Sequence, residues 1–177
     1  IEKIVAALKK LVKEADISNR KVAVSLSETA AFSQVIEIPP LSPRELSTAI
    51  KFEAEQYIPI PMEKVPLDYS IIYTPPKGTE NKKMKVLLVA AKKTAINSVV
   101  NLVEEAGLSP IMMETEMLSL ARIIGNFYAD KSVLVIDFGY KSTDISIIEK
   151  GKIHFLRTVK SGGEALTRAV AQNLRMD

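Results

Sequence analysis

Two apolar strands joined by a short polar turn, between residues 133 and 148, constrain the fold of this chain more than any other stretch. The first strand ends in Asp137, and the turn that follows contains Gly139, two hydroxyl side chains and a second acid before the chain becomes apolar again. Strands this short, in a chain that also contains helical periodicity, need a sheet with helices packed on it. Together with the helical and strand periodicity of the rest of the chain, the stretch indicates an α/β fold with mixed strand directions.

The turn itself has two possible interpretations. Glycine permits the close approach and the unusual backbone angles with which successive amide groups bind an anion. The hydroxyls of Ser142 and Thr143 could donate to phosphate oxygens, and Asp137 could hold Mg²⁺ through water. A plain hairpin whose polar tip faces solvent explains the same residues, so the spacing alone leaves both interpretations open.

The rest of the chain alternates between helical and strand periodicity, with no internal repeat. Ser42 and Glu45 around Pro43 predict a capped helix start. We expect helices over 1–15, 43–57, 94–106, 117–128 and from 163 onward, and strands over 21–25, 32–38, 67–73, 84–91, 110–115, 133–137, 144–149 and 153–160.

Composition excludes several classes of function. The chain has 177 residues, no cysteine and one histidine, which leaves no disulfide framework, no thiolate metal site and no cysteine nucleophile. Its net charge of +3 is too small and too scattered to indicate nucleic acid. No apolar run approaches the roughly 20 residues of a membrane span. The chain begins without Met in mid-pattern, so we expect it to be a piece of a longer protein.

Two other patterns are set aside. The sequence Asp137-Phe-Gly139 copies a kinase signature, but no glycine-rich loop and no His-Arg-Asp precede it. Glu114 and Glu116 are spaced like a glycosidase pair, but no sugar-stacking aromatic residues accompany them, so we interpret them as solvated acids.

Three stretches in order carry a resemblance to a known superfamily. The strand, Asp-x-Gly turn, Thr-Asp and strand of 133–148 resemble the second phosphate-binding motif of the actin/Hsp70 ATPase superfamily. Glu116 to Gly125 resembles the first connecting helix of that superfamily, and Gly162-Gly163 resembles the glycine pair that opens a helix soon after the phosphate hairpin.

A narrower resemblance covers nearly the whole chain. Five segments of the sequence are similar to the PilM family of FtsA-like type IV pilus assembly proteins, and the most specific part of them is Tyr57-Ile-Pro-Ile-Pro61. The segments are Ile38 to Leu46, Ala49 to Pro61, Leu67-Asp-Tyr69, Val86 to Lys92 and Glu105 to Pro110.

This resemblance implies a fold and a division of the chain. The fold is a central fragment of the actin-like ATPase (ribonuclease H-like) fold, in which an inserted subdomain called 1C replaces the usual 1B. Residues 1–40 are expected in subdomain 1A, 41–107 in 1C, 108–131 in 1A again, and 132–177 at the start of subdomain 2A.

The resemblance also implies a nucleotide site between two lobes. Asp137 contacts the Mg²⁺ shell through water, while Gly139, Ser142 and Thr143 line the phosphates. Gly162 and Gly163 border the nucleotide, and Glu116 lies near the attacking water as the catalytic candidate. The first phosphate motif and the adenosine-binding segments of the superfamily are absent from this sequence. We therefore expect the full-length parent to hold ATP and Mg²⁺ and this piece to bind neither tightly.

The implied function is an assembly scaffold. It works in the cytoplasm, at the inner face of the bacterial inner membrane, and binds the cytoplasmic peptide of a PilN-type protein and other pilus components. Attachment to the membrane is peripheral, through these partners, and self-association is possible. The alternatives are an active ATPase that drives assembly, at most a slow one in the parent with this piece inactive, and an FtsA-like polymer.

Overall fold

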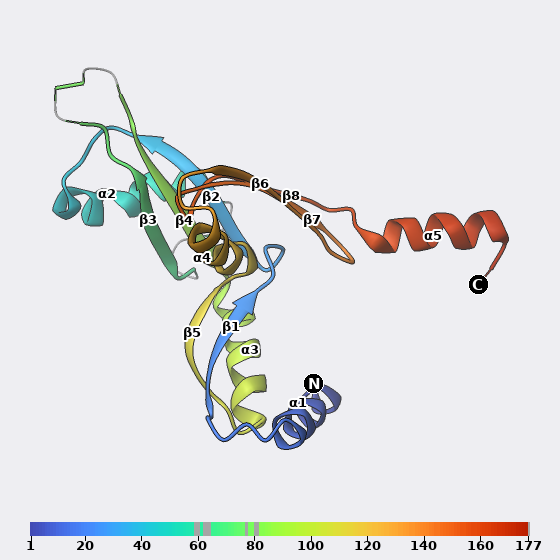
Figure 1. The fold of residues 1–177 in the computed structure, drawn as a ribbon. Coiled ribbons are helices and arrows are strands. Elements are labelled where there is room, and N and C mark those ends of the chain that lie inside the picture. Colours follow the sequence, from blue (N-terminus) through green and yellow to red (C-terminus); the bar gives the residue numbers. More distant parts are fainter. Residues whose placement is uncertain (59–60, 62–64, 77, 80–81, 177) are drawn as a thin grey trace.

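The computed structural model describes most of the chain as three small sheets with five helices (Figure 1). The described residues are 1–58, 61, 65–76, 78–79 and 82–176. The helices are α1 (Glu2–Glu14), α2 (Pro43–Glu55), α3 (Lys93–Glu105), α4 (Glu116–Phe127) and α5 (Gly163–Leu174). The strands are β1 (Lys21–Leu26), β2 (Ala31–Ile38), β3 (Leu67–Tyr73), β4 (Met84–Ala91), β5 (Ser109–Thr115), β6 (Ser132–Phe138), β7 (Thr143–Glu149) and β8 (Lys152–Val159).

The first sheet joins the parallel strands β1 and β5, which have 82 residues of the chain between them and are packed with α1 and α3. Parallel strands need a long crossover, and here the crossover contains the whole second sheet. The apolar stripes of α1 and α3 meet in one core cluster. Its buried members are Val5, Val12, Val103, Ala106 and Leu108.

The second sheet has the order β2-β4-β3, and both pairings are antiparallel. The continuous apolar run of β4 is explained by its central place, because it is paired at both edges and buried on both faces. Helix α2 packs on this sheet through Leu46, Ile50 and Ala54. The predicted capping box is confirmed, since the Glu45 amide donates to Ser42 Oγ and the Glu45 carboxylate accepts from the Ser42 amide.

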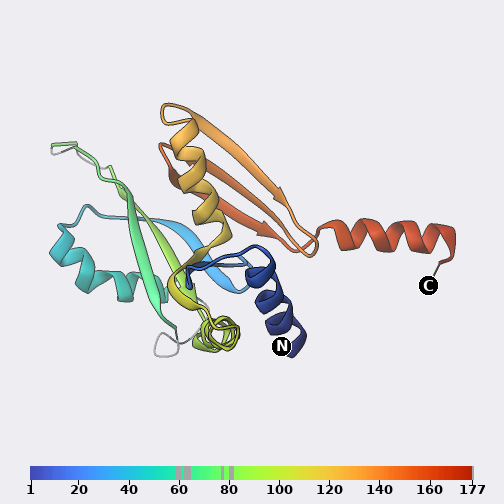
Figure 2. The ribbon, with the colours of Figure 1, turned by 60° about the horizontal axis from the view of Figure 1, so that its bottom comes forward.

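The third sheet is the meander β6-β7-β8, and α4 lies across one of its faces (Figure 2). The helix and sheet approach so closely that a Cβ on Gly125 would lie 2.4 Å from the Gly151 Cα. The cluster beneath α4 also takes residues from the second sheet, such as Ile72 and Leu87. The Nζ of Lys152 on β8 donates to the carbonyls of Ile71 and Ile72 on β3, so hydrogen bonds connect the second and third sheets.

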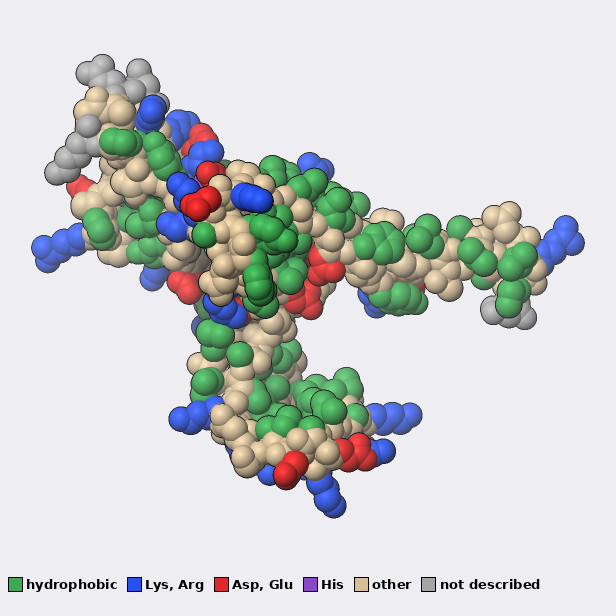
Figure 3. Space-filling model, in the orientation of Figure 1, with side chains coloured by type: hydrophobic (Ala, Val, Ile, Leu, Met, Phe, Trp, Pro, Cys, Tyr) green, Lys and Arg blue, Asp and Glu red, His purple; other side chains and the backbone are tan. Residues whose placement is uncertain are grey.

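Helix α5 extends away from the three sheets (Figure 1), and none of its residues is buried. Its apolar side chains, including Leu166, Val170 and Leu174, are more than half exposed. The face of the third sheet opposite α4 also presents apolar side chains, among them Leu134 and Ile136. Figure 3 shows hydrophobic side chains along the arm formed by this sheet and α5.

Every expected helix and strand is confirmed, with ends that shift by one or two residues. The subdomain limits expected at residues 40 and 107 remain predictions, and the packing of the elements beside them can be described. The limit at residue 40 falls between β2 and α2, although both belong to the second sheet and its helix. The limit at residue 107 follows α3, which packs on α1 and β5 of the first unit. Part of the Tyr57–Pro61 motif lies outside the described residues.

Among the described residues, none of the helices combines the length and the apolar character that crossing a bilayer requires.

Candidate functional site

Two acids face each other where β6 and β7 meet the predicted turn. Asp137 pairs directly with Asp144 in the antiparallel ladder, so both side chains leave the same face of the sheet. Asp144 is only 4% exposed, and Thr158 on β8 donates to its Oδ1. Like charges directly opposite on a sheet repel one another, which makes this an unfavourable pairing for stability alone.

The turn is held against the start of α5. Gly139 N–H donates to the Ser142 carbonyl at 2.9 Å, and the first-turn amides of α5, those of Gly163 and Glu164, donate to the carbonyls of Gly139 and Tyr140. A Cβ at Gly162 would stand 2.3 Å from the Gly139 carbonyl oxygen, so only glycine allows this approach. The structure thus brings the expected glycine residues of the turn and of α5 together.

The two hydroxyls expected at the phosphates have different surroundings. Thr143 Oγ1 donates to the Ser161 carbonyl at 2.7 Å, so its proton is already used in the connection to α5. Ser142 is 8% exposed and lies inside the turn. Tyr140 and Lys141 at the tip of the turn are exposed instead.

Glu116 opens α4, and its carboxyl lies close enough to the two acids of the hairpin for their charges to act on it. Burial raises the pKa of Glu116, and the charges of Asp137, Asp144 and Glu28 raise it further. A carboxyl whose pKa is raised by burial and by like charges is typical of functional clefts. The structure therefore assembles the sequence-predicted Glu116, Asp137, Gly139, Gly162 and Gly163 on one side of the fold.

The acids suit a hydrated cation better than a directly ligated one. Within the part of the chain that the structure describes, no three acidic or histidine side chains stand together as a metal-ligand group. Mg²⁺ keeps several of its waters and is often held by one or two carboxylates together with phosphate oxygens. Asp137, half-buried at the end of its strand, fits contact with such a water shell.

Sequence reasoning missed Glu28, which follows β1 in no recognisable motif. Its side chain is 5% exposed, and its Oε1 accepts the Met117 amide at 3.2 Å. Burial raises the pKa of Glu28, whereas the nearby hydroxyls of Thr115 and Ser33 and the Met117 amide lower it in part. A buried acid 89 residues away in sequence thus caps the first turn of α4, a contact that only the tertiary structure creates.

A groove of about 240 Å³ lies where the first and second sheets meet. Its walls are mostly apolar and come from β3 and β4 on one side and from β5 and α3 on the other. Half-buried Leu67, Ile96 and Met113 line it, together with Asp68 and Glu114. Small-molecule sites usually enclose roughly 300–1,000 Å³, so this groove is smaller than most of them.

The sequence-based interpretation of Glu114 as a solvated acid is wrong. Its side chain is only 15% exposed and forms a two-bond ion pair with Arg122, while Ser119 Oγ also donates to it at 2.9 Å. Burial acts to raise the pKa of Glu114, but the hydrogen bonds from Arg122 and Ser119 and the Arg122 charge outweigh it, so the pKa is lowered. Glu114 therefore fixes α4 to β5 beside the groove.

Replacing Arg122 by glutamine is expected to raise the pKa of Glu114 above its ordinary value, because the larger effect of burial would then be opposed mainly by the Ser119 hydrogen bond. In the wild type the pKa of Glu114 is lower in the folded than in the unfolded protein, so the ionised carboxylate stabilises the fold at pH values above the unfolded pKa. This stabilisation disappears as the pH falls through the folded pKa. The wild type should lose this contribution in acid, and the variant should not. Carboxyl NMR titration with unfolding at several pH values measures both; an unchanged Glu114 pKa would contradict the ion pair.

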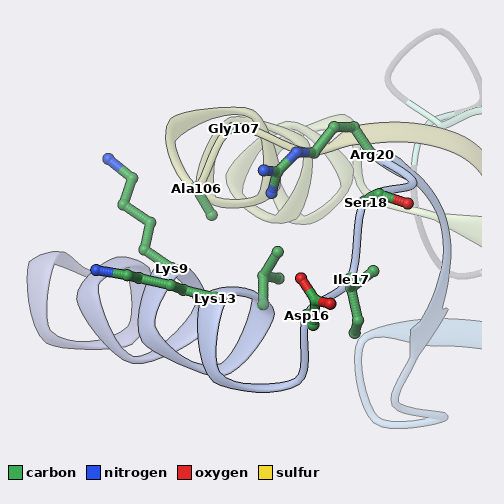
Figure 4. A pocket seen from close by; sticks show the side chains of 9 residues that line it. Lys9, Lys13, Asp16, Ile17, Ser18, Arg20, Ala106 and Gly107 are labelled. Atoms are coloured by element: carbon green, nitrogen blue, oxygen red, sulfur yellow. The ribbon is translucent and has the colours of Figure 1, made fainter.

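A second hollow, of about 650 Å³, lies between α1, the end of α3 and the loop before β1 (Figure 4). Lys9, Lys13 and Arg20 surround it, and Asp16 points into the space between α1 and the loop. All four side chains are exposed, as expected for the solvated lysine face of α1. This hollow is open, and none of Glu28, Glu116, Asp137 and Asp144 lines it.

Comparison with solved structures places the fold among actin-like ATPases. The cytoplasmic domain of EpsL, an inner-membrane component of the type II secretion system of Vibrio cholerae, is 16% identical with a TM-score of 0.61, covering 98% of this chain and 63% of that one. MreB5 of Spiroplasma citri bound to ADP is 16% identical with a TM-score of 0.51, covering 98% of this chain and 35% of that one. At this identity the likeness concerns the fold, which is a fragment of the actin-like ATPase fold.

The family is narrower than the fold. The profile of the family "Type IV pilus assembly protein PilM" matches residues 1–177, and the chain belongs to this family. A solved PilM-PilN type IV pilus biogenesis complex contains a chain that is 27% identical with a TM-score of 0.83, covering 99% of this chain.

A curated relative is the cell division protein FtsA of Neisseria meningitidis serogroup B (strain ATCC BAA-335 / MC58), 28% identical over 92 residues, which is 51% of this chain. The chain spans 53% of the length of the PilM-PilN relative and 22% of the length of this FtsA.

Proposed function

We propose that this chain is part of a type IV pilus assembly scaffold that binds the cytoplasmic peptide of a PilN-type inner-membrane protein. The observation that carries the proposal is the family membership of the entire chain together with the likeness to a protein solved in complex with PilN. Such a scaffold works in the cytoplasm at the inner face of the bacterial inner membrane, to which its partners attach it.

The groove between the first and second sheets is the proposed peptide site. It is small and mostly apolar, and it lies between two units that belong to different sheets. An extended or helical peptide places alternate apolar side chains in such a groove and leaves its polar groups at the rim. The carboxylates of Asp68 and Glu114 at the lining suit hydrogen bonds from peptide amides.

Calorimetric titration of the protein with a synthetic peptide from the amino terminus of its PilN-type partner tests this function. Saturable binding without nucleotide supports a scaffold, with a scrambled peptide as control. Absence of binding to the full-length protein would overturn the proposal. Filaments that form with rising protein concentration would favour the FtsA-like polymer instead.

The proposed nucleotide site of the full-length protein, called the cleft below, lies beside Glu116, Asp137 and Asp144. Asp137 would contact the water shell of Mg²⁺, and Gly139, Ser142 and Thr143 would lie along the phosphates. Gly162 and Gly163 would border the nucleotide. Glu116, with its raised pKa, is the proposed residue near the attacking water. When bound, Mg²⁺ would neutralise phosphate charge beside four carboxyl groups that otherwise repel one another.

Replacing Asp137 by asparagine in the full-length protein is expected to weaken MgATP binding by about tenfold, because a charged contact to the hydrated cation is lost. ATP without Mg²⁺ should bind wild type and variant alike. Titrations with and without Mg²⁺ measure the difference, and equal loss in both would place Asp137 elsewhere. If the wild type hydrolyses ATP and the Asp137→Asn variant does not, the protein is better described as an active ATPase. If residues 1–177 bind ATP as tightly as the full-length protein does, the expectation that this piece contains only part of the nucleotide site is wrong.

The sheets support a proposed division into subdomains. We assign residues 31–91, which contain the β2-β4-β3 sheet and α2, to the inserted subdomain 1C. Residues 1–30 and 92–131 then form the described part of 1A, and the β6-β7-β8 meander with α5 begins 2A. Limited proteolysis should cut in the connections between these units before it cuts within them.

A further inference from the structure

The loop between β1 and β2 carries a carboxylate that the protein has withdrawn from water. Glu28 is 5% exposed, although an unpaired buried carboxylate is costly. Strong hydrogen bonds must therefore offset the cost of burying this carboxylate. Its neighbours come from three separate segments, namely Ser33 on β2, Thr115 at the end of β5 and Met117 on α4.

The contact with Met117 is a helix cap supplied from a distance. The first amides of a helix have no carbonyl partner within it, and the residue before the helix usually satisfies one of them with its side chain. Thr115, which stands at that place before α4, makes no such bond. The carboxylate of Glu28 accepts the Met117 amide instead, where a negative charge is also favoured by the helix dipole.

This cap acts on the turn of α4 that carries Glu116. Glu116 directly precedes Met117 and shares its charge environment with Asp137 and Asp144 across the cleft. The hydroxyls of Thr115 and Ser33 lie close enough to the Glu28 carboxylate to lower its pKa, and among the described residues neither hydroxyl oxygen has a hydrogen-bond partner. The first turn of α4 therefore depends on one side chain from the loop that joins the first and second sheets.

We infer that Glu28 is a positioning residue, whose side chain holds the first turn of α4 and thereby sets Glu116 against the Asp137–Asp144 pair. The reach of the side chain to the Met117 amide defines this role, and the charge adds to it through the helix dipole. The part that concerns Glu116 rests on the proposed nucleotide cleft, whereas the capping of α4 does not.

Three substitutions of Glu28 separate reach from charge. Glu28→Gln keeps the reach and an acceptor oxygen but removes the charge. Glu28→Asp keeps the charge but is one methylene too short to cap the Met117 amide in the same backbone. Glu28→Ala removes both, and Glu104→Ala on the exposed side of α3 is the matched control.

Amide hydrogen exchange of the protein measures the cap without any nucleotide. The first turn of α4 should exchange about tenfold faster in the Asp and Ala variants, while the second half of the helix is unchanged. The Gln variant and the Glu104→Ala control should remain within about threefold of the wild type. If the Ala variant does not fold, the comparison of Asp with Gln still decides the question.

MgATP titration of the full-length variants then measures the consequence for the cleft. The Asp and Ala variants should bind about tenfold more weakly, and Gln should restore most of the loss. The reverse pattern, in which Asp resembles the wild type and Gln resembles Ala, overturns the inference, as does unchanged exchange in Ala. If no protein binds nucleotide, the wild type included, the proposed nucleotide cleft is wrong. The hydrogen-exchange result alone then tests whether Glu28 caps α4.

Discussion

Replacing Ile96 by glutamate is expected to weaken binding of the PilN-type peptide by roughly 100-fold or more, because the variant puts an unpaired carboxylate into an apolar groove that the peptide must fill. Ile96 is half-buried on α3 and lines the groove opposite β3 and β4. The free protein can turn the new side chain toward water, so its fold should remain intact. Isothermal titration with the peptide measures the loss of affinity.

Ile123→Glu is the matched control, because Ile123 is a half-exposed isoleucine on α4 that does not line the groove. This variant should bind the peptide within about twofold of the wild type. Circular dichroism and thermal unfolding should show both variants folded. Wild-type affinity in a folded Ile96→Glu protein would exclude the groove as the peptide site, while leaving the family assignment unaffected.

Replacing Gly125 by alanine is expected to destabilise the protein by about 2 kcal/mol or more. The added Cβ would stand 2.4 Å from the Gly151 Cα and 2.9 Å from the Gly151 nitrogen, which are backbone atoms that cannot rotate away. Alanine also favours the helix by about 1 kcal/mol relative to glycine, so the observed loss is the clash minus this gain. Because the clash moves the β7–β8 turn away from α4, it acts on the whole third sheet.

Urea unfolding of Gly125→Ala beside Asn126→Ala measures this contact. Asn126 is the exposed neighbour in the same helix, and its substitution should be neutral or slightly stabilising. Equal stability of the two variants would mean that α4 and the β7–β8 turn are farther apart in solution. A loss confined to Gly125→Ala would confirm the close packing that holds α4 over the meander.

The capped start of α2 shows how much local sequence can predict. Ser42, Pro43 and Glu45 are neighbours in the chain, and their bonds form within one helical turn, so the capping box was predicted correctly. The same reason explains the agreement on β4, whose unbroken apolar run indicated a strand covered on both faces. The candidate turn with Asp137 and Gly139 was likewise visible, because the strand, turn and strand are contiguous.

Contacts between distant segments could not be predicted in this way. Glu28 has no motif, and its role depends on an amide 89 residues away. Glu114 was expected in solvent because nothing in its neighbourhood indicates burial, yet Arg122 from α4 meets it across the junction with β5. The groove has the same origin, since its walls come from β3, β4, β5 and α3, which touch only after the second sheet has been inserted between β1 and β5.

The sequence by itself determined the helices, the strands and the polar turn between β6 and β7, because hydrophobic periodicity and capping are set by residues within a few positions of one another. Only the tertiary structure decided which carboxylates converge at the cleft, which of them is a cap and where a peptide-sized groove opens. These features arise from the pairing of strands far apart in the chain, and that pairing depends on how three separate apolar surfaces bury one another rather than on any local pattern.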